Sequence, residues 1–200
     1  MLQPKMDRNE SPLDVDDEVI ARAISGDKDS MTAIYDAYAR CLYRYFYCRV
    51  MNVMDAEDLL AQTFLKVLET LPRYRHNGRF TAWIFQIARN KAIDHFRCKR
   101  STVTLDENII DHSDANNVLE SVVKDQNVEK LQKLLRSLNK VELELLRLRF
   151  VADLSYVDIA TLLGRKGDAV RKSIQRILGR LYGQMELQME VRNAQTFDTN

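Results

Sequence analysis

The chain has 200 residues, of which 46% are hydrophobic and 30% are charged, with six glycines and three prolines. These proportions are typical of one or two small, helix-rich globular domains and exclude a chain that is disordered throughout. No run approaches the roughly 18 to 20 uncharged apolar residues of a membrane helix, and residues 1–10 lack the basic-then-apolar order of a secretory signal. We therefore expect a cytoplasmic protein that does not insert into membranes.

The net charge of +1 conceals four blocks of alternating sign. Residues 1–72 carry 8 basic and 13 acidic side chains, 73–100 carry 8 and 1, 101–128 carry 1 and 6, and 129–200 carry 13 and 9. Two basic segments separated by an acidic one indicate two contacts with a polyanion rather than one diffuse basic surface. The pattern predicts a bipartite nucleic-acid-binding protein.

Two helices are predicted after a disordered tail over residues 1–15, which holds two prolines and little apolar content. Acidic residues at 16–18 suit the first turn of a short helix that ends at Gly26. Apolar and aromatic residues then recur at spacings of three and four, which predicts a longer helix over about 28–51.

A third and a fourth helix follow, each with one polar face. Asp55 is the expected N-cap of the third helix, and Pro72 ends it. Thr81 is the expected cap of the fourth, whose apolar stripe includes Trp83 and Ile93 and whose other face is cationic.

The second half of the chain begins with an acidic, asparagine-rich stretch over 101–127, which predicts a linker rather than a domain. Helical periodicity returns over 128–186, with Asn139 as an expected N-cap, and 187–200 is a polar tail. No segment shows strand alternation. The chain is therefore predicted to be all-α, with helical domains at 16–100 and 128–186 joined by a flexible acidic linker.

A helix-turn-helix is predicted near the C-terminus. Ser155 opens a short helix, and Ala160 allows the next helix to cross it closely. Gly164 suits a turn with a positive backbone dihedral, and Val170 lies on the buried face of the next helix. The outer face of that next helix is basic and suits a DNA major groove. An ordinary solvated amphipathic helix is the alternative. The cations of this segment are Arg165, Lys166, Arg171, Lys172, Arg176 and Arg180.

Three passages in this order and spacing resemble the extracytoplasmic-function (ECF) group of bacterial sigma-70 family sigma factors. They are residues 55–65 (DAEDLLAQTFL), residues 80–90 (FTAWIFQIARN) followed by Asp94 and Arg97, and residues 155–160 (SYVDIA) leading to Gly164 and Val170. The resemblance covers roughly residues 17–100 and 129–183. It implies that domain 16–100 is sigma region 2 and domain 128–186 is region 4.

The resemblance implies that the third helix binds the clamp helices of the largest subunit of core RNA polymerase, while the second domain meets the flap of the second-largest subunit. Asp58 and Gln62 take the contact positions of the third helix, with Glu57 nearby. An acidic helix face complements a basic coiled coil. The family often has Gln followed by an acid where this chain has Ala61-Gln62, so this interface is expected to carry less charge.

For the minus-ten promoter element, the resemblance implies that the loop before the fourth helix and the exposed face of that helix capture a base flipped out of the opened strand. Phe80 and Trp83 are expected in the core instead, Tyr74 is the aromatic residue expected on DNA, and Asp94 either contacts DNA or only pairs with Arg97 or Lys91. The residues implied are Tyr74, Arg75, His76, Asn77 and Arg79 in the loop, and Asn90, Lys91, Asp94, His95, Arg97, Lys99 and Arg100 on the helix.

For the minus-thirty-five element, the resemblance implies contacts from the second helix of the helix-turn-helix. Lys166 departs from the family, which commonly has a capping Ser there, so Gly167 or Asp168 must cap the helix or Lys166 must reach a phosphate. The acidic linker either threads the polymerase channel or is only a solvated spacer. The residues implied are Lys166, Asp168, Arg171, Lys172, Gln175 and Arg176.

Other functional classes fit the sequence less well. An enzyme is not expected, because the chain has no phosphate-binding glycine loop, nucleophile elbow or metal-spaced His/Cys/Asp set, and no cofactor or metal is expected. A stand-alone helix-turn-helix regulator does not explain the acidic face of the third helix. A protein that mimics a sigma factor would need a partner domain, for which this chain has no room. The resemblance further implies an anti-sigma factor as regulator and a monomer outside the holoenzyme.

Overall fold

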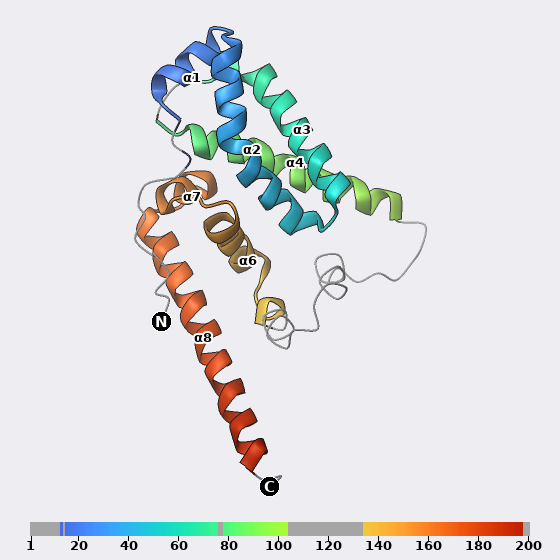
Figure 1. The fold of residues 1–200 in the computed structure, drawn as a ribbon, viewed down its shortest axis with the longest axis vertical. Coiled ribbons are helices and arrows are strands. Elements are labelled where there is room, and N and C mark those ends of the chain that lie inside the picture. The colour runs from blue at the N-terminus through green and yellow to red at the C-terminus, as the bar shows by residue number, and fades with distance from the viewer. Residues whose placement is uncertain (1–12, 14, 76–77, 104–133, 198–200) are drawn as a thin grey trace.

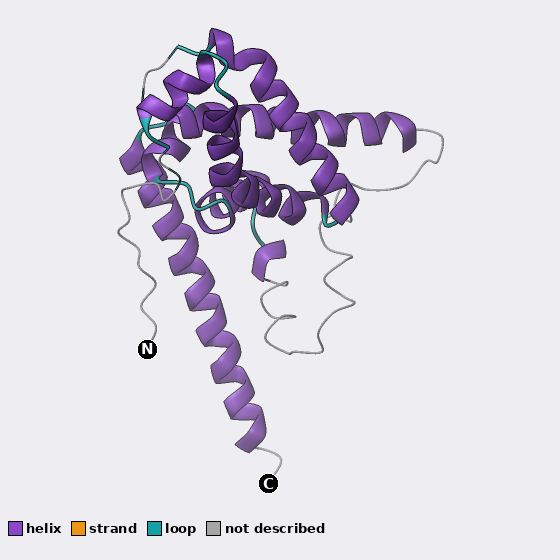
Figure 2. Cartoon of the chain, turned by 45° about the horizontal axis from the view of Figure 1, so that its top comes forward, coloured by secondary structure: helices purple, strands orange, loops and turns teal. Residues whose placement is uncertain are grey.

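The structure is a computed structural model, and it describes residues 13, 15–75, 78–103 and 134–197. All regular elements within these ranges are helices, as the sequence predicts (Figure 2). None of the helices in the described part of the chain is long and apolar enough to cross a membrane.

The N-terminal unit is a bundle around an aromatic core. Tyr38, Tyr45, Phe46 and Phe85 are each at most 1% exposed and fill its centre. The long helix that carries the first three of them packs against the helices on either side in sequence, as the apolar stripe of that segment predicts. The elements of this unit are α1 (Asp17–Ile24), α2 (Lys28–Val50), α3 (Val53–Thr70), the 3₁₀ turn η1 (Leu71–Arg73) and α4 (Phe80–Val103).

Two predicted caps in this unit are wrong. The N-cap of α3 is Asn52, whose side-chain oxygen accepts from the Asp55 N–H at 3.0 Å, so Asp55 lies in the first turn instead. Thr81 lies inside α4 and is buried, with its hydroxyl 2.7 Å from that of Tyr38. Ile93, predicted to face inward, is 43% exposed, whereas its neighbour Ala92 is fully buried, so Ile93 lies off the buried face of α4.

The C-terminal unit contains the predicted helix-turn-helix. Its caps at Asn139, Ser155 and Gly164 are those predicted from the sequence. The last helix shows no break at residue 186 and extends away from the body of the molecule to Phe197 (Figure 1), so the predicted tail is helical over 187–197. The elements of this unit are α6 (Lys140–Leu146), the π-helical η3 (Arg147–Val151), α7 (Tyr156–Leu163) and α8 (Gly167–Phe197).

The two units are in contact. α4 packs against α7, α2 packs against η3, and the buried apolar side chains of both units form one continuous cluster. Most of the predicted linker and the start of the second domain, residues 104–133, lie outside the described residues, whereas 101–103 belong to α4. The sequence predicts two helical domains but gives no indication that they touch.

Candidate nucleic-acid interface

The helix-turn-helix is held by local hydrogen bonds. The Ser155 hydroxyl accepts from the Asp158 N–H at 3.0 Å and donates to the Asp158 carboxylate at 2.6 Å, which fixes the start of α7. Gly164 ends α7 with φ of 62°, in the left-handed region that favours glycine. The Arg165 N–H donates to the Ala160 carbonyl at 2.8 Å. These contacts direct the chain into α8 at a defined angle.

The first turns of α8 present a cationic face. Val170, Ile174 and Ile177 are buried on the opposite side of the helix. Lys166 occupies the position before the helix, where its carbonyl accepts from the Val170 N–H at 3.1 Å, and Asp168 lies in the first turn. All six predicted residues are exposed together on this face: Lys166, Asp168, Arg171, Lys172, Gln175 and Arg176.

The predicted minus-ten residues lie on α4 and in the loop before it. Arg75 and Arg79 are exposed in the loop, while His76 and Asn77 lie outside the described residues. On α4, Lys91 and His95 are half-buried, and the side chain of Arg100 is not described. Asp94 pairs with Arg97 at 3.2 Å, one of the two arrangements expected from the sequence. The predicted residues of this helix that are exposed are Asn90, Asp94, Arg97 and Lys99.

Tyr74 is part of a half-buried aromatic cluster. Its ring centroid lies 4.7 Å from that of Trp83 and 5.4 Å from that of Phe80. Phe80 is buried, as predicted, and Trp83 is half-buried against the core. Packing on both rings fixes Tyr74 at the base of the loop.

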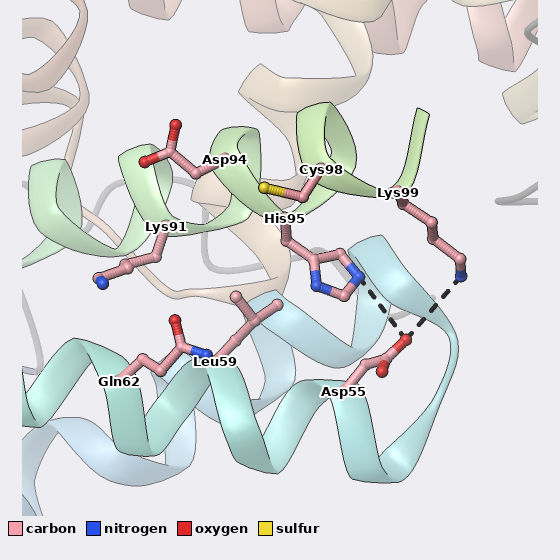
Figure 3. A pocket seen from close by; sticks show the side chains of 8 residues that line it. All are labelled: Asp55, Leu59, Gln62, Lys91, Asp94, His95, Cys98 and Lys99. Atoms are coloured by element: carbon pink, nitrogen blue, oxygen red, sulfur yellow. Dashed lines mark ion pairs between the residues drawn. The ribbon is translucent and has the colours of Figure 1, made fainter. Parts of the chain in front are cut away.

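The acidic face of α3 lies beside the cationic face of α4. Glu57 and Asp58 are exposed, and the Gln62 amide donates to Asp58 at 2.7 Å. A hollow of about 510 Å³ is lined by residues of both helices (Figure 3). Asp55, which the sequence analysis did not place in a site, lies on its rim 3.6 Å from His95 and 4.0 Å from Lys99. One acid of α3 thus neutralises part of the charge of α4.

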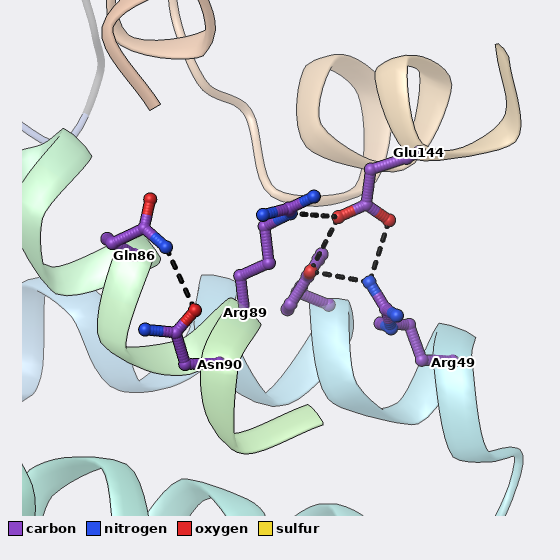
Figure 4. A network of polar contacts seen from close by, with 6 residues as sticks. Arg49, Gln86, Arg89, Asn90 and Glu144 are labelled. Atoms are coloured by element: carbon purple, nitrogen blue, oxygen red, sulfur yellow. Dashed lines mark hydrogen bonds and ion pairs between the residues drawn. The ribbon is translucent and has the colours of Figure 1, made fainter. Parts of the chain in front are cut away.

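A buried polar network joins the two units (Figure 4). Glu144 of α6 accepts from the Tyr45 hydroxyl and from Arg49 of α2, each at 2.8 Å, and lies 3.8 Å from Arg89 of α4. Burial raises the pKa of Tyr45 despite the opposing effect of the Arg49 cation, so the hydroxyl stays protonated and donates. No pattern in the sequence predicts this site. Its one signal is an acid, Glu144, inside the leucine-rich stripe 143–146.

Metal-ligating and thiol side chains are the remaining candidates for chemistry in the described part of the chain. Within these residues, no group of three or more His, Cys, Asp or Glu side chains is placed to hold a metal ion. The Cys41 thiol is buried and donates to the Tyr38 carbonyl at 3.0 Å, and burial raises its pKa to about 12. Cys41 is therefore an unreactive core residue rather than a nucleophile.

Comparison with protein families gives two matches in the order that the sequence predicts. Residues 34–102 match Sigma-70 region 2, and residues 128–181 match Sigma-70, region 4. The first match contains α3 and α4 up to residue 102, and the second contains the helix-turn-helix.

Curated relatives agree with these matches. The chain is 35% identical over 161 residues to the ECF RNA polymerase sigma factor BldN of Streptomyces coelicolor, an alignment that covers 77% of this chain and 60% of that protein. It is 30% identical over 172 residues to the ECF RNA polymerase sigma factor SigD of Mycobacterium tuberculosis, which covers 82% of this chain and 81% of the relative.

Two solved structures share the fold. CnrH in complex with the cytosolic domain of CnrY is 20% identical with a TM-score of 0.63, covering 87% of this chain and 99% of that one. The sigma factor RpoE in complex with the anti-sigma factor NepR from Bartonella quintana is 18% identical with a TM-score of 0.59, covering 78% and 96%. At these identities the likeness supports the arrangement of helices alone.

Proposed function

The chain belongs to the ECF sigma factors of the sigma-70 family, and from this membership we propose how it directs core RNA polymerase to promoters. The observation that carries the proposal is the separation of cationic faces. One lies on α4 within region 2 and the other on α8 within region 4, and an acidic helix face adjoins the first. Two cationic faces on separate units suit two stretches of one DNA.

Polymerase binding is assigned to α3. Glu57 and Asp58 are exposed near the start of the helix, and the bond from Gln62 holds the Asp58 carboxylate in place. A fixed acidic face steers association with a basic surface and sets its orientation. The clamp helices of the largest polymerase subunit are the proposed partner. The flap of the second-largest subunit is the proposed partner of region 4.

Recognition and melting of the minus-ten element are assigned to the 74–79 loop and to α4. Arg97 and Lys99 on the helix and Arg75 and Arg79 in the loop supply charge for the phosphates of the opened strand. The free energy gained when the loop captures an unstacked base must exceed the few kcal/mol that unstacking costs. The packed Tyr74 gives this loop a rigid base, which reduces the entropy lost on capture.

Recognition of the minus-thirty-five element is assigned to α8. Arg171, Lys172 and Gln175 lie in the early turns, where a recognition helix meets base edges, and Arg176 follows toward the phosphates. Lys166 precedes the helix and provides no side-chain cap, so its ammonium group is assigned to a phosphate.

Regulation by an anti-sigma factor is part of the proposal. The two structural neighbours are named as complexes, CnrH with CnrY and RpoE with NepR. We infer a comparable inhibitor for this chain, acting in the cytoplasm on a sigma factor that is monomeric outside the holoenzyme. The rival function, a stand-alone helix-turn-helix regulator, leaves the acidic face of α3 and the region 2 match without a role.

The proposal is tested by transcription in vitro from a library of randomised promoters, using purified core polymerase and the purified chain, with transcripts read by sequencing. The expected result is enrichment of a two-part motif whose halves lie near minus ten and minus thirty-five. Enrichment that requires the chain supports the proposal. Transcription that is unchanged by the chain, or enrichment of a single operator-like motif, contradicts it.

A further inference from the structure

Two basic side chains of α4 share one carboxylate of α3. The Oδ2 atom of Asp55 lies 3.6 Å from Nε2 of His95 and 4.0 Å from Nζ of Lys99 (Figure 3). His95 and Lys99 are four residues apart, so they lie on one face of the helix. Both belong to the set assigned to the minus-ten element, whereas Asp55 has no assigned role. One acid is thus shared between two side chains that are proposed to meet DNA.

The His95 ring lies where its charge state alters the contact. Its side chain is 21% exposed, and among the described residues its buried Nε2 atom has no hydrogen-bond partner. A neutral imidazole faces the Asp55 carboxylate at a distance too long for a hydrogen bond. A protonated imidazole forms an ion pair with the same oxygen. Histidine is the side chain whose charge ordinarily changes between pH 5 and 8, so pH in this range decides how strongly Asp55 is engaged.

The other titratable groups of the hollow lie on α4 itself. Asp94 points away from α3 (Figure 3) and pairs with Arg97 at 3.2 Å, so it does not compete with Asp55. Lys91 and Cys98 complete the titratable lining of the hollow. Asp55 is thus the acid of the hollow that faces the histidine.

Charged groups on the neighbouring helices are engaged elsewhere. Arg49 of α2 lies 5.9 Å from the ring of Phe96, the residue after His95, but Glu144 of α6 accepts from this arginine at 2.8 Å. α7 also packs against α4, and the carboxylate of its Asp158 accepts a hydrogen bond at the start of α7. The charge balance of the hollow is therefore set by residues of α3 and α4.

We propose that Asp55 is a positioning residue of the minus-ten face, and that protonation of His95 releases Lys99 from Asp55 to bind a DNA phosphate. The inference rests on the proposed function, which places α4 on DNA. With His95 neutral, the carboxylate competes with phosphate for the Lys99 ammonium group. With His95 charged, the carboxylate pairs with the imidazolium, which solvent screens less because it is 21% exposed against 52% for Lys99. Acid conditions thus add one phosphate contact to α4.

A salt titration at two pH values measures the number of phosphate contacts. Holoenzyme assembled from core polymerase and the full chain is titrated with a promoter whose minus-ten segment is single-stranded, and binding is followed by fluorescence anisotropy. We expect the slope of log affinity against log salt concentration to be steeper by up to about one at pH 6 than at pH 8. At about 0.1 M salt, affinity is expected to be at least about threefold higher at pH 6.

Four variants separate release of Lys99 from a direct contact between His95 and DNA. His95→Gln is expected to lose the gain at pH 6. Lys99→Gln is expected to lose it as well, whereas a direct contact of the imidazolium with a phosphate would preserve it. Asp55→Asn removes the competing carboxylate and is expected to show the steeper slope at both pH values. His112→Gln, the same change at a histidine outside the described residues, is the matched control and is expected to keep the gain.

Two results would overturn the inference: equal slopes at the two pH values in the original chain, or a full gain at pH 6 in Lys99→Gln. Should Asp55→Asn not melt cooperatively, Lys99→Gln at its exposed site decides. If no holoenzyme forms, the proposed function fails. The same comparison is then made with the free chain and a single-stranded oligonucleotide of about 20 nucleotides at low salt. Absence of binding there, or equal binding at both pH values, overturns the role of Asp55 independently.

Discussion

Arg149 shows how one buried side chain supports the C-terminal unit. It is 8% exposed, donates to the Leu154 carbonyl at 2.8 Å and lies 4.7 Å from the centre of the Tyr156 ring. The cation thus ties η3 to the segment that leads into α7. Nothing local in the sequence distinguishes Arg149 from a surface arginine, because both of its partners follow a bend in the chain that periodicity does not predict.

Replacement of Arg149 by Met keeps most of the volume but removes the hydrogen bond and the cation. We expect Arg149→Met to lower the free energy of unfolding by about 1.5–3 kcal/mol, the range for a hydrogen bond to a charged group. Urea denaturation measures this quantity. Arg22→Met removes an exposed pair and is expected to cost less than about 0.5 kcal/mol. Equal effects of the two changes would contradict the structural role of Arg149.

Helix caps show where local reasoning succeeds and where it fails. Asn139 and Ser155 were predictable because each is followed three residues later by an acid at a clear start of periodicity. At α3 the same rule selected Asp55 wrongly. Met51 ends α2 with φ of 53°, so only Met51 and Asn52 separate the two helices, and Asn52 takes the cap of α3. The sequence does not show how short that connection is.

Two helices of the C-terminal unit are tied by an ion pair, Arg180 of α8 with Glu142 of α6, at 2.7 Å. The hydrogen bond from Arg180, together with that from the Asn139 N–H, holds the pKa of Glu142 below its ordinary 4.5. A lowered carboxyl pKa contributes stability above the unfolded value and loses it as pH falls through the folded value. The ion pair between Arg180 and Glu142 therefore weakens only at acidic pH.

We expect the melting temperature to fall between pH 5 and pH 3 with a smaller slope in Glu142→Gln than in the original chain, because the variant has no carboxyl to protonate there. Thermal unfolding followed by circular dichroism at a series of pH values measures the slopes. Glu69→Gln, in an exposed pair with Lys66, is the control and is expected to keep the original slope. An unchanged slope in Glu142→Gln would mean that the Arg180–Glu142 ion pair contributes nothing to the free energy of unfolding.

The recognition helix and α4 are expected to respond differently to loss of a cation. Arg171→Ala should cost about 1–3 kcal/mol on the preferred upstream element and relax the preference at one base position. Lys99→Gln should weaken holoenzyme binding to all promoters alike and reduce the salt slope by about one. Binding of holoenzyme to matched and mutated promoters at several salt concentrations checks both. Equal losses on all promoters for Arg171→Ala would remove it from base recognition.

At the scale of the whole molecule, the sequence predicts the helices, the two units and the cationic faces, because each depends on residues close together in the chain. It does not predict that the units touch. Tyr45 and Arg49 meet Glu144 across 99 and 95 residues, and no periodicity encodes such a pairing. The same limit explains Asp55, which lies 3.6 Å from His95 on another helix that was predicted separately.

We propose that α3 binds core RNA polymerase, and the function proposed for this chain depends on that contact. Fluorescence anisotropy of the labelled chain, titrated with core polymerase in the absence of DNA, measures that binding most directly, with Asp58→Lys as the variant and Asp29→Lys on α2 as the matched charge reversal. We expect saturable binding by the original chain and by Asp29→Lys, and at least about tenfold weaker binding by Asp58→Lys, because a like charge then faces the basic clamp. No binding by the original chain at low salt, or equal binding by all three, would contradict the account.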